Sequence, residues 1–336
     1  MAGRRPAQRR RAQRRRNPVT TAAPAAQDRP AVLVTAADLA PEALALLDGY
    51  RIVYAGKTPS DQDIVDLCRA HDPAAIIVRY GKVGAAAMDA APSLRVISKH
   101  GSGTDTIDKA AAQARNIDVV AAVGANAAAV VEQALALLLA CAKSVIALDV
   151  RMRAGHWDKA THKSEELAGK TLGLVGLGAI GLRMAKMGAA LDMRVIGHDP
   201  FAKNLPADVR QVDLDTIWRE SDAISLHCPL TDDNRGLLNA RTLAQCKPGV
   251  ILVNTARGGL IDEAALIDAV RSGQVMAAGL DSFAVEPMTA GHPFQHEKNI
   301  ILSPHIGGVT RAAYVNMGIA AARNVLAALA RQAAAR

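Results

Sequence analysis

The chain has 336 residues, half of them hydrophobic, about a fifth charged and only 3% aromatic. These proportions indicate a globular protein of two domains and exclude a disordered or fibrous one. The net charge of +8 suggests a nucleic-acid partner, but eight Arg lie in residues 1–16, and the rest of the chain has 32 basic and 32 acidic residues. We therefore expect no specific nucleic-acid binding by the folded part.

Residues 1–28 are rich in Arg, Ala, Gln and Pro and have no apolar periodicity, which predicts a disordered basic tail. The composition favours a solvated or artefactual extension. A weak anion-binding arm and a targeting peptide are the alternatives. The targeting peptide is the weakest, because eight Arg in sixteen positions leave no amphipathic stripe.

Apolar runs typical of strands then alternate with helical stretches. The first strands are expected at residues 31–36, 51–55, 74–80, 94–99 and 117–123, with helices at 41–47 and 61–70 among them. A long helix follows over residues 125–147. A second series of strands is expected at residues 171–175, 193–198, 223–228, 250–254, 275–280 and 300–303. Six strands with intervening helices match a doubly wound dinucleotide-binding sheet.

This alternation predicts an α/β protein of two Rossmann-like or flavodoxin-like domains with parallel sheets. The last helix, over residues 311–334, is expected to pack back on the first domain. The substrate domain is then discontinuous, with residues 29–124 and 312–336, and residues 125–311 form the NAD-binding domain. We expect no further domain after the last helix.

The sequence predicts no membrane span, because the most apolar stretch, residues 134–142, is short and is followed by Lys143. No secretory signal is visible. The four cysteines have neither metal-binding nor redox spacing. We therefore expect that the protein binds no metal, that its thiols are buried and that it is cytoplasmic.

A glycine-rich turn, Gly176-Leu-Gly178-Ala-Ile-Gly181, joins an apolar strand to a helix. This context favours dinucleotide binding, because Gly176 permits the tight turn, Gly178 lets the backbone approach a pyrophosphate and Gly181 lets the helix pack close to the strand. Asp199 ends the next strand, 18 residues beyond Gly181. A carboxylate there accepts hydrogen bonds from ribose hydroxyls and repels a 2′-phosphate, so the sequence predicts NAD as cofactor.

Three further strand ends carry reactive side chains. Arg257 follows one strand, beside two glycines, and a guanidinium there can grip a carboxylate with two hydrogen bonds. Glu286 lies beyond the next strand and His305 beyond the last. Histidine suits proton transfer to a carbonyl oxygen because its pKa lies near neutrality, and a carboxylate beside it raises that pKa.

The runs LGLVGLGAIG, VNTARGGLIDEAAL, GLDSFAVEP and SPHIGG resemble those of the D-isomer-specific 2-hydroxyacid dehydrogenases. The resemblance covers roughly residues 30–330 and is nearest in pattern to the phosphoglycerate dehydrogenase branch. It implies that Arg257 binds the substrate carboxylate, that His305 is the acid/base and that Glu286 raises the pKa of His305. The implied cofactor-binding residues are Ser102, Gly176, Gly178, Ala179, Ile180, Gly181, Asp199, Cys228, Thr255, Asp281 and Gly308.

Among these, Asp281 is implied to hold the nicotinamide carboxamide. The implied substrate-binding residues are Arg79, Lys99, His100, Gly101, Ser102 and Arg257, with Arg79 meeting a distal anionic group. Arg79, Lys82 and Lys99 together predict a substrate with a second anionic or strongly polar group. We expect phosphohydroxypyruvate as the preferred substrate and hydroxypyruvate as the next. The chain departs from the usual pattern at Tyr80, where relatives have a small residue, and at His100, where many have an apolar one.

The favoured function is therefore an NAD-dependent 2-hydroxyacid dehydrogenase acting on 3-phosphoglycerate, or alternatively a hydroxypyruvate/glyoxylate reductase. An NAD-sensing corepressor-like binding protein is the alternative from another class, and the complete Arg257, Glu286 and His305 set favours catalysis over it. The apolar helix over residues 125–147 also predicts a homodimer through the NAD-binding domain. Steady turnover of a 2-oxo acid separates the enzyme from the binding protein.

Overall fold

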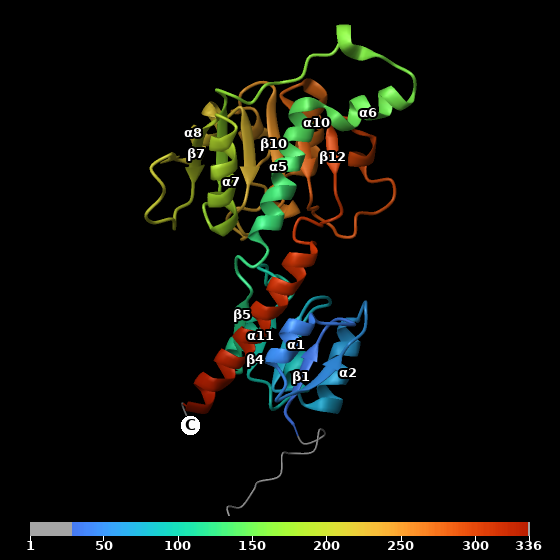
Figure 1. The fold of residues 1–336 in the computed structure, drawn as a ribbon, viewed down its shortest axis with the longest axis vertical. Coiled ribbons are helices and arrows are strands. Elements are labelled where there is room, and N and C mark those ends of the chain that lie inside the picture. The colour runs from blue at the N-terminus through green and yellow to red at the C-terminus, as the bar shows by residue number, and fades with distance from the viewer. Residues whose placement is uncertain (1–28, 335–336) are drawn as a thin grey trace, which may run out of the picture.

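The computed structural model describes residues 29–334 and places them in two α/β units, drawn one above the other in Figure 1. The chain crosses to the second unit between β5 (Asp118–Ala121) and α5 (Ala127–Lys143). It returns after β12 (Ile300–Leu302) through α11 (Arg311–Ala334), which packs on the first unit. The predicted tail, residues 1–28, lies outside the described residues.

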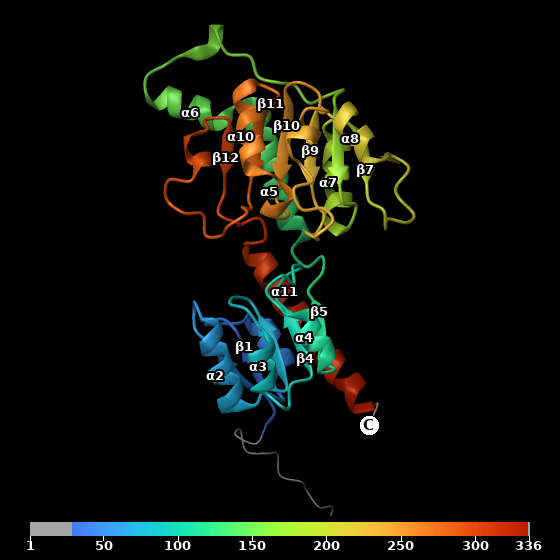
Figure 2. The same ribbon diagram turned by 180° about the vertical axis from the view of Figure 1, so that it is seen from behind.

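The first unit is a five-stranded parallel sheet with the order β2-β1-β3-β4-β5, as in flavodoxin-like folds. Its other strands are β1 (Ala31–Val34), β2 (Arg51–Tyr54), β3 (Ala75–Val78) and β4 (Val96–Lys99). Helices α1 (Pro41–Leu46) and α11 cover one face (Figure 1). Helices α2 (Asp61–His71), α3 (Ala85–Asp89) and α4 (Lys109–Ala114) cover the other (Figure 2). The predicted discontinuous fold is confirmed, since the last helix completes this unit.

The second unit is a seven-stranded parallel sheet with the order β12-β11-β10-β9-β6-β7-β8. Its other strands are β6 (Thr171–Val175), β7 (Arg194–His198), β8 (Val209–Gln211), β9 (Ala223–Leu226), β10 (Val250–Asn254) and β11 (Val275–Leu280). The strand order reverses at β6, and ligands of such sheets bind off the carboxyl ends of the strands at this point.

Helices cover both faces of the second sheet. Helices α5 and α7 (Ala179–Ala190) lie on one face, and α8 (Leu214–Glu220) and α10 (Glu263–Ser272) lie on the other (Figures 1 and 2). Shorter elements are α9 (Ala240–Leu243) and the 3₁₀ turns η1 (Asp158–Ala160), η2 (Gly258–Leu260) and η3 (Pro293–His296). Small residues permit close packing of the layers: a Cβ on Gly279 of β11 would lie 2.7 Å from Cβ of Leu137 on α5.

Two expectations about the second unit were wrong. The helix predicted over residues 125–147 ends at Lys143, and α6 (Val145–Arg153) then runs at 60° to α5. Ser144 causes the break, because it adopts a left-handed backbone with φ +53° and caps α5. Strand β8 was not predicted, since three residues with only Val209 buried give no periodic signal.

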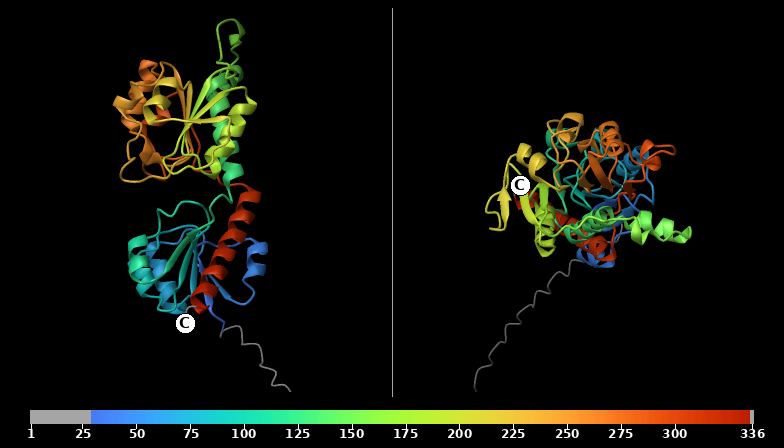
Figure 3. Two further views of the ribbon diagram at one scale, coloured as in Figure 1. Left: turned by 90° about the vertical axis from the view of Figure 1, so that its left-hand side faces the viewer. Right: turned by 90° about the horizontal axis from the view of Figure 1, so that it is seen from above.

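Helix α11 is also long and apolar enough to cross a membrane by length and composition, which the sequence analysis did not foresee. Its apolar residues Ala321, Ala322, Val325 and Ala328 are buried in the core of the first unit, on the face that α1 shares. Figure 3 shows α11 lying along that sheet. Burial of this kind is also typical of the core helix of an α/β domain.

Candidate active site

The glycine-rich turn lies between β6 and α7, where the strand order reverses. Gly176 has φ +96°, and a Cβ on it would lie 2.7 Å from the backbone nitrogen of Cys228. A Cβ on Gly181 would lie 2.0 Å from the Gly176 carbonyl oxygen. Gly178 faces open space and begins α7 without a side-chain cap, so the first N–H groups of the helix are free for an anion.

Asp199 follows β7 and lies beside this turn. Its Oδ2 accepts a hydrogen bond from the Leu177 N–H at 2.8 Å, and its Oδ1 accepts one from the Phe201 N–H at 2.9 Å. Thr255, after β10, has a buried hydroxyl without a hydrogen-bond partner among residues 29–334. Burial raises the pKa of the Cys228 thiol to about 11, so that side chain is neutral. The open turn, the carboxylate and the unpartnered hydroxyl fit NAD.

The imidazole of His305 is paired with a carboxylate. Its Nδ1 lies 2.7 Å from Oε2 of Glu286, and Oε1 of Glu286 accepts a hydrogen bond from the Phe283 N–H at 2.9 Å. His305 has a left-handed backbone with φ +52°, which is uncommon outside glycine. One carboxylate oxygen thus holds the ring and the other anchors Glu286 to the backbone, which leaves Nε2 as the ring atom for a substrate.

This pairing shifts both pKa values. The hydrogen bond that His305 donates to Glu286 raises the pKa of His305, and it outweighs the burial and the Arg257 charge that oppose it. Burial acts to raise the pKa of Glu286, but the hydrogen bonds from His305 and Phe283 outweigh it, so the net shift is downward. The two groups therefore form an ion pair over a wider pH range than isolated side chains would.

Asp281 is buried at the end of β11 and anchors the loop that carries His305. Its carboxylate accepts hydrogen bonds from Ser303 Oγ at 2.6 Å, the Ile306 N–H at 3.0 Å and the Gly307 N–H at 2.7 Å. Three of its acceptor positions are thus used within the protein. The sequence assigned this carboxylate to the nicotinamide, whereas the structure shows it holding the Ser303 side chain before His305 and two backbone N–H groups after it.

Arg257 follows β10 and crosses to the first unit. Its Nε and Nη2 donate to Oδ2 of Asp105 at 2.9 and 2.7 Å, and its Nη1 donates to the Ala256 carbonyl oxygen at 2.7 Å. Gly103 permits this crossing, because a Cβ there would lie 1.6 Å from Nη2. Asp105 was not predicted from the sequence, although it lies only three residues beyond Ser102, which was predicted to bind the substrate.

The loop after β4 carries the other predicted substrate-binding residues. Lys99 donates to the Arg79 carbonyl oxygen at 3.2 Å, and burial, with Arg257 nearby, lowers its pKa to about 8. His100 is buried, and burial lowers its pKa to about 4, so the ring is neutral. Gly101 has φ +144°, and the exposed Ser102 reaches Asn126 Oδ1 at 3.3 Å.

Comparison with known proteins identifies the family. The D-isomer specific 2-hydroxyacid dehydrogenase NAD binding domain matches residues 135–307. The chain is 44% identical over 247 residues to a hydroxypyruvate reductase of Thermotoga maritima, a match that covers 73% of this chain and 81% of the relative. The chain belongs to the D-isomer-specific 2-hydroxyacid dehydrogenase family. It is accordingly an NAD-dependent oxidoreductase.

Other relatives share the fold but differ in length. A D-3-phosphoglycerate dehydrogenase of Archaeoglobus fulgidus is 40% identical over 256 residues, covering 75% of this chain but only 49% of the relative. The chain thus spans about half the length of such relatives. The crystal structure of a glyoxylate reductase from Paecilomyes thermophila is 28% identical, with a TM-score of 0.80, and the match covers 90% of this chain and 96% of that one.

Arg79 was predicted to meet a distal anionic group of the substrate, but in the structure its guanidinium is already paired with a carboxylate of the protein. Its Nη1 donates to Oδ1 of Asp38 at 2.6 Å, and its guanidinium lies 4.8 Å from the centre of the Tyr314 ring. The Tyr314 hydroxyl donates to the same Asp38 oxygen at 2.9 Å. The positive charge of Arg79 is thus largely compensated by a carboxylate that the sequence analysis did not identify.

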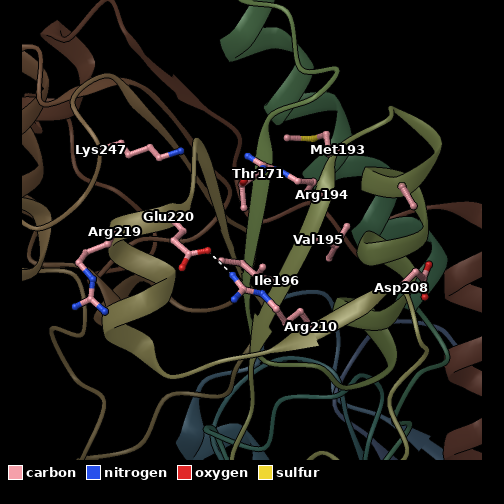
Figure 4. Close-up of a pocket in the computed structure, with 11 residues that line it drawn as sticks. Thr171, Met193, Arg194, Val195, Ile196, Asp208, Arg210, Arg219, Glu220 and Lys247 are labelled. Atoms are coloured by element: carbon pink, nitrogen blue, oxygen red, sulfur yellow. Dashed lines mark hydrogen bonds and ion pairs between the residues drawn. The ribbon is translucent and has the colours of Figure 1, made fainter.

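A separate cavity of about 550 Å³ lies near the amino ends of β6 and β7 (Figure 4). Basic residues Arg194, Arg210, Arg219 and Lys247 line it, and Arg210 is paired with Glu220 across it. The cavity has none of the predicted site residues in its lining, and it lies at the opposite end of the strands from Gly176 and Asp199. The predicted site residues lie instead at the carboxyl ends of the strands.

Proposed function

We propose that the chain reduces a small 2-oxo acid to the D-2-hydroxy acid, and catalyses the reverse oxidation, with Arg257, Glu286 and His305 as the catalytic residues. The observation that carries this proposal is the His305–Glu286 pair at 2.7 Å. It lies beyond β11 and β12, next to the strand β10 that precedes Arg257. The three side chains thus come from adjacent strand ends.

The pair provides the proton that reduction needs. NAD supplies or accepts the hydride when bound. As the carbonyl carbon is reduced, negative charge builds on its oxygen, and His305 donates the Nε2 proton to that oxygen. Glu286 stabilises the imidazolium and fixes the ring through Nδ1. In the oxidation, neutral His305 takes the hydroxyl proton through the same nitrogen.

Arg257 orients the substrate. Its guanidinium binds the carboxylate of the 2-oxo acid and stabilises charge on the carbonyl oxygen, because several N–H donors of fixed geometry face the site. The backbone N–H groups of Gly101 and Ser102 add donors for the same carboxylate, whereas the His100 N–H donates to the Val78 carbonyl oxygen at 2.9 Å. The charge of Arg257 already acts on the pKa of both His305 and Lys99, which supports its place in the same site.

The turn between β6 and α7 would hold the cofactor. The first N–H groups of α7, from Ala179 and Ile180, would bind the pyrophosphate, and Asp199 would accept hydrogen bonds from the ribose hydroxyls. The residues that would contact the rest of the cofactor are Ser102, Cys228, Thr255, Asp281 and Gly308. The free helix terminus at Gly178 and the unpartnered Thr255 hydroxyl support this placement.

For the substrate we place hydroxypyruvate first and phosphohydroxypyruvate second, reversing the order expected from the sequence. The ion pair between Arg79 and Asp38 supports the smaller substrate, because a phosphate would have to compete with the Asp38 carboxylate for the Arg79 guanidinium. Lys99 supports a polar group at C3, since its ammonium is half-buried and forms no ion pair with a carboxylate among residues 29–334.

A spectrophotometric assay of NADH oxidation tests the function. We expect turnover of hydroxypyruvate to be fastest and that of phosphohydroxypyruvate to be second, ahead of glyoxylate, pyruvate, sulfopyruvate and branched 2-oxo acids. An NAD-sensing binding protein on the same fold would bind NADH and show no steady turnover of any of them. The tail, residues 1–28, is tested by comparing the full chain with a tail-deleted chain for activity and for nucleic-acid binding.

The chain assembles as a homodimer through the NAD-binding unit. The apolar stripe of α5 that suggested this is internal, because Ala134, Leu137 and Leu138 are buried in the unit's own core. Helix α6 is a better dimer surface, since it projects from the body and exposes Val145, Ile146, Val150 and Met152 (Figures 1 and 3). Trp157 beyond it is 73% exposed. Sedimentation at micromolar concentration would show only monomer if this assembly is wrong.

The domain division follows the two crossings of the chain, with residues 29–124 and 312–336 as the substrate domain and 125–311 as the NAD-binding domain. A cytoplasmic location is consistent with the four cysteines, which are free thiols in the structure.

A further inference from the structure

The side chain of Arg257 is already bound to a carboxylate, that of Asp105. Both donors of the fork formed by Nε and Nη2 point to one oxygen, Asp105 Oδ2, at 2.9 and 2.7 Å. The remaining nitrogen, Nη1, donates to the Ala256 carbonyl oxygen at 2.7 Å. The side-on fork, whose parallel donors match the two oxygens of a carboxylate, is therefore occupied.

The substrate carboxylate cannot bind Arg257 independently of Asp105. On the side-on fork it must replace the Asp105 carboxylate. On the end-on fork, between Nη1 and Nη2, it would lie next to that carboxylate and be repelled by it, because like charges a few ångströms apart oppose each other in a half-buried site. In either position the negative charge of Asp105 weakens substrate binding.

From this geometry we propose that Asp105 is an internal substitute for the substrate carboxylate, and that substrate binding exchanges one carboxylate for the other on Arg257. The proposal rests on the proposed role of Arg257 in binding the substrate. Asp105 is a positioning residue: it holds the guanidinium extended over Gly103, toward the substrate loop, until a 2-oxo acid takes its place. A ketone that lacks a carboxylate has nothing to exchange.

The surroundings of the pair agree with an exchangeable contact. It is the only ion pair that joins the two units among residues 29–334, so its release is coupled to their relative position. The Asp105 side chain is 53% exposed and can turn into solvent when displaced, whereas the Arg257 side chain is 29% exposed. Burial acts to raise the pKa of Asp105, but Arg257 outweighs it and the net shift is downward. The competing group is therefore charged at neutral pH.

The test is the affinity of oxamate, a small carboxylate shaped like a 2-oxo acid, for the full chain with NADH bound. Asp105→Asn keeps the shape and an acceptor oxygen but removes the charge. We expect it to tighten oxamate binding by roughly three- to tenfold, since a larger fraction of Arg257 is then competent to bind. The KM for the 2-oxo acid should fall in parallel, with kcat within about threefold of the parent.

Three controls make the result specific. Asp105→Glu keeps the charge and should not tighten oxamate binding. Asp66→Asn removes a carboxylate from an exposed ion pair with Arg69 on α2, and it should change nothing. Oxamide, the neutral analogue of oxamate, should bind the parent and Asp105→Asn with equal affinity. In an Arg257→Ala background, Asp105→Asn should have no effect on oxamate.

The outcomes separate this proposal from the proposed function. If oxamate binding depends on Arg257 but is unchanged or weaker in Asp105→Asn, the exchange is wrong and Asp105 only supports Arg257. If oxamate binds equally well with and without Arg257, the assignment of Arg257 to the substrate carboxylate fails first. If Asp105→Asn does not fold, the oxamate affinity of Asp105→Glu decides, because a tightening there would contradict a competition between charges.

Discussion

The Nδ1 atom of His305 lies 2.7 Å from Oε2 of Glu286, and this contact makes the pH dependence of the reaction predictable. The hydrogen bond to this carboxylate raises the pKa of the imidazole above its usual value. Reduction needs the imidazolium and should decline as pH rises through that pKa, whereas oxidation needs the neutral ring and should increase over the same range. Both directions are governed by one group.

Replacement of Glu286 by Gln should therefore move the pH profile rather than abolish activity. Glu286 raises the pKa of His305, so loss of its negative charge should lower that pKa. The decline of the reduction rate should then shift to lower pH. The measurement is kcat/KM for reduction between pH 5 and 9. A variant whose profile coincides with that of the parent would contradict the assigned role of Glu286.

Removal of the imidazole tests the acid/base assignment itself. His305→Ala should lose roughly 10²–10⁴-fold in kcat, the usual range for a positioned acid/base group. NADH affinity should stay close to that of the parent, because the glycine-rich turn and Asp199 lie on other strands. Turnover within a few-fold of the parent would show that another group supplies the proton.

Arg257→Lys separates the charge of Arg257 from its geometry. An ammonium keeps the charge but cannot donate two parallel hydrogen bonds, so we expect kcat/KM to fall by about 10²-fold or more. The dissociation constant of NADH, measured by fluorescence titration, serves as the control and should be unchanged. Activity close to the parent would mean that charge alone is sufficient at this position.

The catalytic set could be predicted from sequence because each member immediately follows an apolar strand or ends a short loop after one. Parallel strands bring their carboxyl ends together, so Arg257 and His305 share one edge of the sheet. The partners of these groups were less accessible. Asp105 and Asp38 lie in loops of the first unit, 152 and 41 residues from the arginines they bind, and no local pattern marks such pairs.

The bounds of the two long helices were predicted with different accuracy. Helix α11 was predicted with its observed bounds, whereas the end of α5 was missed, because Ser144 is not a residue type that usually adopts the left-handed cap conformation. Asp281 was identified as a site residue, but its three hydrogen bonds to Ser303, Ile306 and Gly307 depend on the folded loop. The sequence could not show how its acceptor positions are used.

Asp199 should determine the choice of cofactor. Its carboxylate lies beside the glycine-rich turn, held by the Leu177 N–H at 2.8 Å, where it would repel a 2′-phosphate. We expect NADH to be preferred over NADPH by at least roughly tenfold in kcat/KM, and Asp199→Ala to reduce this preference. Equal or better use of NADPH by the parent would contradict the assignment.

The last prediction concerns the pair of Arg79 and Asp38, which are joined at 2.6 Å. If Asp38 neutralises Arg79, then Asp38→Asn should leave a cation with a weaker partner and favour a phosphorylated substrate. We expect the ratio of kcat/KM for phosphohydroxypyruvate to that for hydroxypyruvate to rise by about three- to tenfold, in line with the modest strength of a partly exposed ion pair. Arg79→Ala should instead raise the KM for phosphohydroxypyruvate more than that for hydroxypyruvate.

Because Tyr314 also donates to Asp38 at 2.9 Å, Tyr314→Phe is the control that removes this contact while keeping the ring under Arg79. If the ratio stays the same in both Asp38→Asn and Arg79→Ala, Arg79 does not face the distal part of the substrate, and the preference between the two substrates has another origin.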